Sequence, residues 1–233
     1  MMKHYKLLAL ILLSVSSMGY AQKGKLFGEI NYNTFSHNDL KSFQEELISD
    51  FTEIQLVKND NFPGNIGFTV GYTINDINTS IFASYTSTGG KASYSDYSGI
   101  IRLTEAIYGI TLGGEYLINL NGNNNTKGDF NLGLRGLVTF SNMEIESYGD
   151  LSDQIESDSI EFSSVDFGGG LRIIYEYPIS FFNLRLSLGF DVVIGGKYKF
   201  KEDSEYHLED KNGDAVKNGW TGLRSGIGIS IPL

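Results

Sequence analysis

The segment Asn183–Gly196 reads NLRLSLGFDVVIGG and alternates between two kinds of side chain. The apolar set comprises Leu184, Leu186, Leu188, Phe190, Val192 and Ile194. The intervening set is small or charged and comprises Arg185, Ser187, Gly189 and Asp191. Because successive side chains of a β-strand point to opposite faces, this alternation predicts a strand with one apolar and one polar face.

The same alternation recurs along the whole chain. The predicted strands lie at 25–35, 65–74, 78–87, 105–118, 130–141, 165–177, 183–196 and 222–233. The connections at 75–77, 119–128 and 178–182 are shorter, and those at 36–62, 88–103, 143–163 and 199–218 are longer. Segments of about ten residues in which apolar and polar side chains alternate are typical of membrane-spanning barrels. In such barrels short turns join the strands at one end and long loops join them at the other.

The N-terminus has the order of a secretory signal peptide. MMKHYK is basic, Leu7–Val15 is a short apolar run, and Gly19 and Ala21 are small. The apolar run is shorter than the roughly 20 residues that a spanning helix needs. We therefore expect residues 1–21 to be removed and residues 22–233 to form a single barrel domain.

Composition narrows the classes of partner and chemistry. Taking Lys3 and Lys6 from the 18 basic residues leaves 16 against 28 acidic ones, a net charge of −12 for the mature chain. An acidic surface argues against nucleic acid as a partner. The sequence has no cysteine, which excludes disulfide staples and cysteine–zinc sites.

Charged residues lie on the polar face of the predicted strands. They are Glu29, Glu115, Arg135, Asp166, Arg172, Glu176, Arg185, Asp191 and Arg224. An enclosed polar interior favours arginine, because its guanidinium group pairs with carboxylates through two parallel hydrogen bonds. We therefore predict an all-β fold: an eight-stranded antiparallel transmembrane β-barrel with an apolar exterior and a lumen filled by an arginine–carboxylate network. A soluble periplasmic barrel of the lipocalin type, with an apolar interior, is the alternative.

One segment has helical periodicity. In Ser36–Ile54 five apolar residues recur at helical spacing: Leu40, Phe43, Leu47, Phe51 and Ile54. This spacing predicts an amphipathic helix inside the first outer loop. The helix can pack on the barrel rim, cover its mouth as a lid or lie in the membrane interface.

These features resemble the small outer-membrane β-barrel proteins of Gram-negative bacteria, of the OmpA/OmpX-like or OmpW-like porin superfamily. The resemblance rests on pattern and layout, and its most specific part is the last strand. There Gly226, Gly228, Ile229, Ile231 and Leu233 look like the assembly signal of such barrels, although the family's terminal aromatic residue is replaced by leucine. The resemblance implies location in the cell outer membrane, contact with its lipid and lipopolysaccharide, and the barrel-assembly machinery as a partner during biogenesis.

Signals for catalysis are few. The mature chain has two histidines, His37 and His207, both in predicted outer loops, and no spacing places either against a nucleophile. The acidic stretch Glu144–Glu161 suits a divalent cation, but acidic outer loops are mostly solvated, so we predict no metal site and no cofactor. We predict a non-enzymatic barrel with a structural, binding or narrow passive-permeability role. A lipid-modifying enzyme that uses the loop histidines is the alternative.

Overall fold

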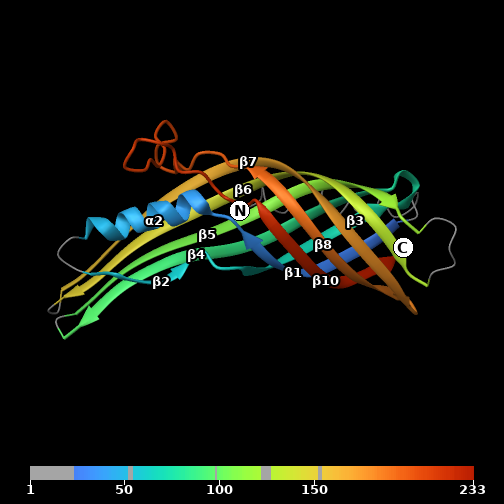
Figure 1. The fold of residues 1–233 in the computed structure, drawn as a ribbon, viewed down its shortest axis with the longest axis horizontal. Coiled ribbons are helices and arrows are strands. Elements are labelled where there is room, and N and C mark those ends of the chain that lie inside the picture. The colour runs from blue at the N-terminus through green and yellow to red at the C-terminus, as the bar shows by residue number, and fades with distance from the viewer. Residues whose placement is uncertain (1–23, 52–54, 98, 122–126, 152–153) are drawn as a thin grey trace, which may run out of the picture.

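The computed structural model describes residues 24–51, 55–97, 99–121, 127–151 and 154–233. The predicted signal peptide, residues 1–21, lies outside them, as does Ile54. The elements are β1 Gly24–Phe35, α2 Asn38–Asp50, β2 Val57–Asn61, β3 Asn65–Ile74, the 3₁₀ turn η1 Asn75–Ile77, β4 Thr79–Asp96, β5 Gly99–Asn119, β6 Asp129–Leu151, β7 Gln154–Ile179, β8 Phe182–Ile194, β9 Lys199–Phe200 and β10 Gly222–Pro232 (Figure 1). Neither helix in these ranges is long and apolar enough to cross a membrane.

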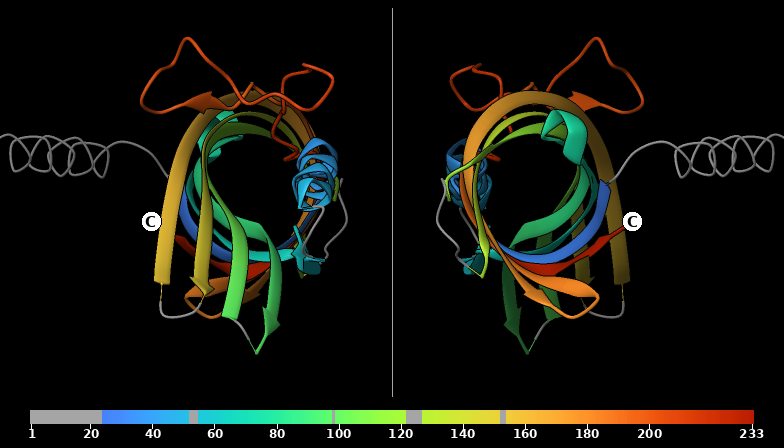
Figure 2. Two further views of the ribbon diagram at one scale, coloured as in Figure 1. Left: turned by 90° about the vertical axis from the view of Figure 1, so that its left-hand side faces the viewer. Right: turned by 90° about the vertical axis from the view of Figure 1, so that its right-hand side faces the viewer.

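Eight long strands form a closed antiparallel ring, seen end-on in Figure 2. Around the ring the order is β1, β3, β4, β5, β6, β7, β8 and β10. The last strand pairs with the first from Lys25↔Pro232 to Phe35↔Gly222, which closes the ring. Closure leaves the ring strands without a free edge along this seam, so the prediction of a closed eight-stranded antiparallel ring is confirmed. The two short strands β2 and β9 lie outside the ring, paired with β4 and β7, and were not predicted.

The two ends of the ring differ, and we name them by their connections. The turn end carries η1, the end of β5, the start of β6, the turn between β7 and β8, and Leu233, at the right of Figure 1. The loop end carries α2, residues 195–221 and the tips of two long hairpins, at the left.

The prediction of loops at 88–103 and 143–163 is wrong. Strands β4 and β5 stay paired out to Asp96↔Gly99, and β6 and β7 stay paired out to Leu151↔Gln154. These hairpins project beyond the rest of the ring (Figure 1). Most outward-facing side chains of these projecting hairpins are polar, for example Glu144 and Glu146. The alternation of apolar and polar residues therefore stops, although the backbone hydrogen bonds between the strands continue.

Apolar side chains face outward around the ring and polar ones face inward. Val70 of β3 is 60% exposed and Leu188 of β8 is 56% exposed, whereas the inward Arg185 is 2% exposed. This parity is the one expected from the segment 183–196. The ring interior is therefore charged, and its exterior is apolar.

A buried apolar cluster fills the loop-end half of the ring and extends towards the turn end through Phe27 and Phe82. Helix α2 contributes Leu40 and Phe43, residues 195–221 contribute Tyr198 and Trp220, and the cluster also includes Phe35. Helix α2 packs against β2 and β4. Its apolar side is thus turned into the protein, where it helps to fill the loop end.

Candidate functional site

The lumen holds a lower group of ion pairs, nearest the turn end. The Nη1 of Arg185 donates to Glu176 Oε1 at 2.6 Å and its Nε donates to Glu29 Oε1 at 2.5 Å. Arg172 also donates to Glu29. Lys25 reaches Glu176 Oε2 at 2.7 Å. Strands β1, β7 and β8 supply these five side chains, which we call the lower group.

An upper group lies further from the turn end. Asp191 of β8 is the centre: Arg224 Nε donates to its Oδ2 at 2.6 Å, and Arg135 Nη1 lies 3.3 Å from both of its oxygens. Glu115 lies 3.7 Å from Arg135 Nε, beyond hydrogen-bond distance. Asp191 is fully buried. A buried carboxylate is tolerated when cations compensate it, as two arginines do here.

Aromatic rings pack against the guanidinium groups. Arg185 stacks over Phe27 at 4.2 Å, and Arg135 stacks over Phe82 at 4.4 Å. Such cation–π contacts add to the ion pairs when water is excluded. The rings also take up space that glycine leaves at facing positions, since Phe82 covers Gly113.

Asp166 is inward-facing but pairs with no arginine. It accepts hydrogen bonds from Ser141 Oγ at 3.0 Å, from Asn218 Nδ2 at 3.1 Å and from the backbone N–H of Gly196 at 2.6 Å. The structure therefore brings eight of the nine predicted lumen residues into ion pairs and surrounds Asp166 with uncharged hydrogen-bond donors. It adds Lys25, which sequence reasoning left out because it stands at a strand end.

His37 lies in an aromatic cage at the loop end. Its ring centroid is 4.8 Å from that of Trp220 and 5.8 Å from that of Phe35. Neither ring nitrogen has a hydrogen-bond partner among the described residues, and burial lowers the pKa of His37 to about 3. The imidazole is therefore neutral at physiological pH and acts as an apolar filler.

The close approach of two chain segments fixes this cage. The backbone N–H of His37 donates to Gly219 O at 3.2 Å. A Cβ at Gly219 would lie 2.5 Å from the backbone nitrogen of His37. Only glycine allows this approach, and it brings the neighbouring Trp220 against the imidazole.

The second histidine lies elsewhere. His207 is partly exposed, with Nε2 3.1 Å from Glu209 and 3.3 Å from Lys197. Among the described residues neither histidine hydrogen-bonds to a serine or threonine hydroxyl or to the other histidine. In the described part of the chain no group of three histidine or acidic residues is placed to hold a metal ion. The acidic stretch 144–161 runs along two paired strands.

The residues of the predicted assembly signal all lie in or next to β10. Gly226 and Gly228 pair with β1 and β8, and a Cβ at Gly228 would meet the backbone of Gly28. Ile229 and Leu233 are exposed on the outer face. The arrangement places an apolar, glycine-containing strand at the seam of the ring.

No protein-family model and no curated protein sequence matches this chain. Solved structures with a similar fold include a major outer membrane protein from Thermus thermophilus, with 11% identity, a TM-score of 0.46 and coverage of 90% of this chain and 99% of that one. Ail, the attachment invasion locus protein of Yersinia pestis, shows 13% identity, a TM-score of 0.40 and coverage of 91% and 99%. Neisserial surface protein A shows 12% identity, a TM-score of 0.38 and coverage of 90% and 97%. The structural neighbours are thus outer-membrane β-barrel proteins of Gram-negative bacteria, the group that the sequence resembles.

Proposed function

We propose that the protein is an integral β-barrel of the bacterial outer membrane, with a structural or binding role and a lumen closed by its own side chains. The observation that carries this proposal is the apolar exterior of the ring, on which Leu188 is 56% exposed while the inward Arg185 is 2% exposed. Water-soluble proteins rarely leave a continuous apolar belt exposed. A bilayer supplies an apolar solvent for the belt, and the closed ring satisfies its backbone hydrogen bonds.

The lengths of the connections support one orientation in the membrane. Outer-membrane barrels have short turns on the periplasmic side and long loops outside. The turn end would therefore face the periplasm, and the loop end would face the cell exterior. Any binding role would then belong to α2, the two hairpins and residues 195–221, since recognition residues concentrate on such elements.

The lumen supports a structural role over bulk diffusion. An eight-stranded barrel is just wide enough for side chains to fill its interior. Here the lower and upper groups are followed by the apolar cluster at the loop end. Ion-paired arginines and packed aromatic rings leave at most a narrow polar path. The lipid-modifying alternative is not favoured, because the His37 imidazole is buried among aromatic rings and His207 lies against Glu209 and Lys197.

The last strand supports a role in assembly. We include in the proposal that Gly226, Gly228, Ile229, Ile231 and Leu233 are read by the barrel-assembly machinery. These residues lie in or next to β10, and the pairing of β10 with β1 closes the ring. Lipid and lipopolysaccharide would contact the apolar exterior.

Membrane fractionation tests the location. We expect the full chain to stay in the outer-membrane pellet after a carbonate wash. We also expect the unheated barrel to run faster than the boiled chain on a denaturing gel, because a closed ring resists unfolding in detergent. Release by carbonate would contradict the proposal.

A pair of lysine substitutions tests the belt directly. Leu188 pairs with Ile173, and Ile155 lies 18 residues along β7 from Ile173 on the same outward parity, about 60 Å of strand away. In a bilayer, Leu188→Lys should cost about 2–4 kcal/mol, whereas Ile155→Lys at the exposed hairpin tip should cost close to nothing. Equal effects on refolding into vesicles would argue against a membrane belt at Leu188.

Planar-bilayer recording tests the closed lumen. The refolded wild-type barrel should show no large steady conductance. A stable open channel that passes uncharged solutes would contradict closure by the ion pairs.

A further inference from the structure

A buried carboxyl group lies against helix α2 at the loop end. Glu105 of β5 is 1% exposed, and its partners in the neighbouring strands are Gly90 of β4 and Ile145 of β6. Gly90 also pairs with Asn61 of β2, whereas β3 pairs with β4 no further towards the loop end than Thr86. Glu105 therefore belongs to the projecting hairpins, outside the part of the ring that we assign to the membrane.

The glycine at position 90 lets Glu105 and α2 share one space. A Cβ at Gly90 would collide with the side-chain amide of Gln44, on α2, and would lie 2.6 Å from Glu105 Oε2. Gln44 is fully buried, and its Nε2 donates to the backbone oxygen of Asp60 at 3.1 Å. Glu105 and Gln44 thus meet over the glycine, and we call this contact the seat of α2.

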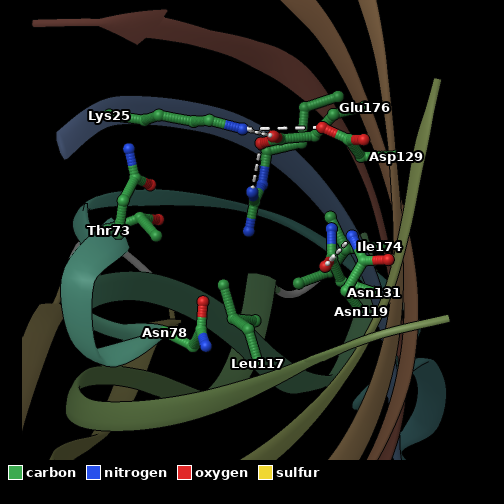
Figure 3. Close-up of a pocket in the computed structure, with 11 residues that line it drawn as sticks. Lys25, Thr73, Asn78, Leu117, Asn119, Asp129, Asn131, Ile174 and Glu176 are labelled. Carbon is green, nitrogen blue, oxygen red and sulfur yellow. Dashed lines mark hydrogen bonds and ion pairs between the residues drawn. The ribbon is translucent and has the colours of Figure 1, made fainter. Parts of the chain in front are cut away.

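The carboxyl group of Glu105 has no compensating charge. Glu176 of the lower group, by contrast, is bound by Lys25 (Figure 3) and by Arg185. Among the residues that the structure describes, Glu105 forms no ion pair, and its Oε2 has no hydrogen-bond partner. Burial alone raises the pKa of Glu105 from 4.5 to about 8. The protonated acid is therefore the form that suits a seated helix.

The amide of Gln44 favours the same form. Its Oε1 is buried and has no hydrogen-bond donor within the described ranges. A protonated carboxyl group carries an O–H donor, whereas a carboxylate offers only acceptors. An ionised Glu105 would thus place a charge without a donor beside an amide oxygen that already lacks one, at a further cost in free energy.

The charged groups around the seat leave Glu105 without a ready cation. Lys41 and Glu45 lie beside Gln44 on α2, and Lys58 of β2 donates to Glu45 Oε1 at 2.7 Å. The charged residues of the surrounding strands have the opposite parity and face outward: Asp60, Lys91, Arg102, Glu144 and Glu146. An ionised Glu105 could gain a cation only by drawing Lys58 away from Glu45 or by reorienting Lys41.

We propose that Glu105 is a proton-operated latch for α2. The helix stays on its seat while the carboxyl group is protonated. Ionisation breaks the carboxyl O–H bond and passes the proton to water or a buffer base, and the remaining charge is hydrated when α2 moves away. Release would open the loop end, because Leu40 and Phe43 of α2 belong to the apolar cluster that fills it. In the orientation proposed above the latch would respond to the pH outside the cell, but the latch itself does not depend on that orientation.

Proton linkage sets the pH dependence of release. Glu105 keeps its proton up to about pH 8 on the seat, but only up to about pH 4.5 once it is hydrated. Between these values each rise of one pH unit should increase the ratio of released to seated helix by close to tenfold, and above about pH 8.5 the ratio should level off. His37, next to α2, acts in the opposite direction below about pH 6.5. The range from about pH 6.5 to 9 therefore isolates Glu105.

Thiol labelling of a buried position on α2 measures the release. The sequence has no cysteine. Leu40→Cys therefore gives a single probe on the buried side of the helix, and Tyr97→Cys gives a reference at a fully exposed hairpin position. The ratio of the two labelling rates, in the refolded full chain in detergent, cancels the pH dependence of thiol reactivity. This ratio should rise close to tenfold from about pH 6.5 to 7.5 and flatten above about pH 8.5. Phe43→Cys takes the place of Leu40→Cys if that variant does not refold.

Two matched substitutions assign the effect to Glu105. Glu105→Gln keeps the shape but cannot ionise, so it should abolish the rise. Glu146→Gln removes an exposed carboxylate from the neighbouring strand and should leave the rise unchanged. The gel shift on heating shows whether each variant is folded.

Three outcomes would overturn the latch. They are a flat labelling ratio in the chain that keeps Glu105, an equal rise after Glu105→Gln, and loss of the rise after Glu146→Gln. None of them depends on whether the barrel lies in a membrane, so the latch can fail while the proposed function stands.

Discussion

Replacing Asp191 by asparagine should destabilise the barrel strongly. Asp191 is fully buried and is the only carboxylate within 3.5 Å of Arg224 or Arg135 among the described residues. The Asp191→Asn change is nearly isosteric, so it removes a charge with little change in shape. Two buried guanidinium groups would then lose their compensating partner.

The size of the effect follows from the distances. At an effective dielectric constant of about 20, unit charges attract by about 6 kcal/mol at 2.6 Å and about 5 kcal/mol at 3.3 Å. Asparagine keeps one acceptor oxygen, and the free carboxylate no longer has to be desolvated, which offsets part of this attraction. Removing one partner of a buried pair typically costs about 3–5 kcal/mol, and we expect that range here.

Urea unfolding of the barrel refolded into vesicles measures this cost. The double variant Asp191→Asn/Arg224→Gln should be at least about 1 kcal/mol more stable than the sum of the single changes predicts, because it removes a charge of each sign. Asp129→Asn is the matched control: its carboxylate is 55% exposed, and its loss should cost less than about 1 kcal/mol. A loss below about 1 kcal/mol for Asp191→Asn, or strict additivity in the double variant, would refute the reasoning.

Three further predictions concern the loop end. Because burial lowers the pKa of His37 to about 3, the wild-type barrel should lose stability as pH falls from about 6.5 towards 3, by about 3 kcal/mol at pH 4.5. His37→Leu should remove this pH-dependent loss of stability. If the free energy of unfolding in urea still falls as much at acid pH in the variant, the prediction is contradicted. Ser141→Ala leaves the buried Nε1–H of Trp220, now 2.8 Å from Ser141 Oγ, without that acceptor and should cost about 1–3 kcal/mol, measured by urea unfolding followed by tryptophan emission. Gly219→Ala should speed protease cleavage within 195–221, whereas Gly149→Ala, with nothing within 4 Å of its new Cβ, should not; equal cleavage rates would argue against the close approach at Gly219.

Strand parity could be predicted from sequence because it is local. Arg185 and Leu188 lie on opposite faces in any extended backbone, so one segment is enough to separate the charged from the apolar side. The prediction of a barrel implies a ring without a free edge, and such a ring pairs its last strand with its first, as β10 pairs with β1. Which acid pairs with which arginine was not predictable, because register and barrel width set those distances.

Other features depended on contacts between distant segments. Asp166 has the same parity as Asp191, yet Ser141 and Asn218 surround it instead of arginine. The cage around His37 needs Trp220, which is 183 positions later in the chain. The hairpin lengths were missed because a polar ladder held by backbone hydrogen bonds carries no apolar alternation.

The ion pairs of Glu29 cross the seam of the ring. Glu29 belongs to the first strand, and its two arginines belong to β7 and β8, 143 and 156 residues later. Both arginines lie in the last third of the chain, whereas Glu29 lies in the first strand. Until they arrive, Glu29 can stay hydrated and the ring can stay open. Joining β1 to β10 therefore brings Glu29 to its two arginines, so we expect these ion pairs to form as the ring closes.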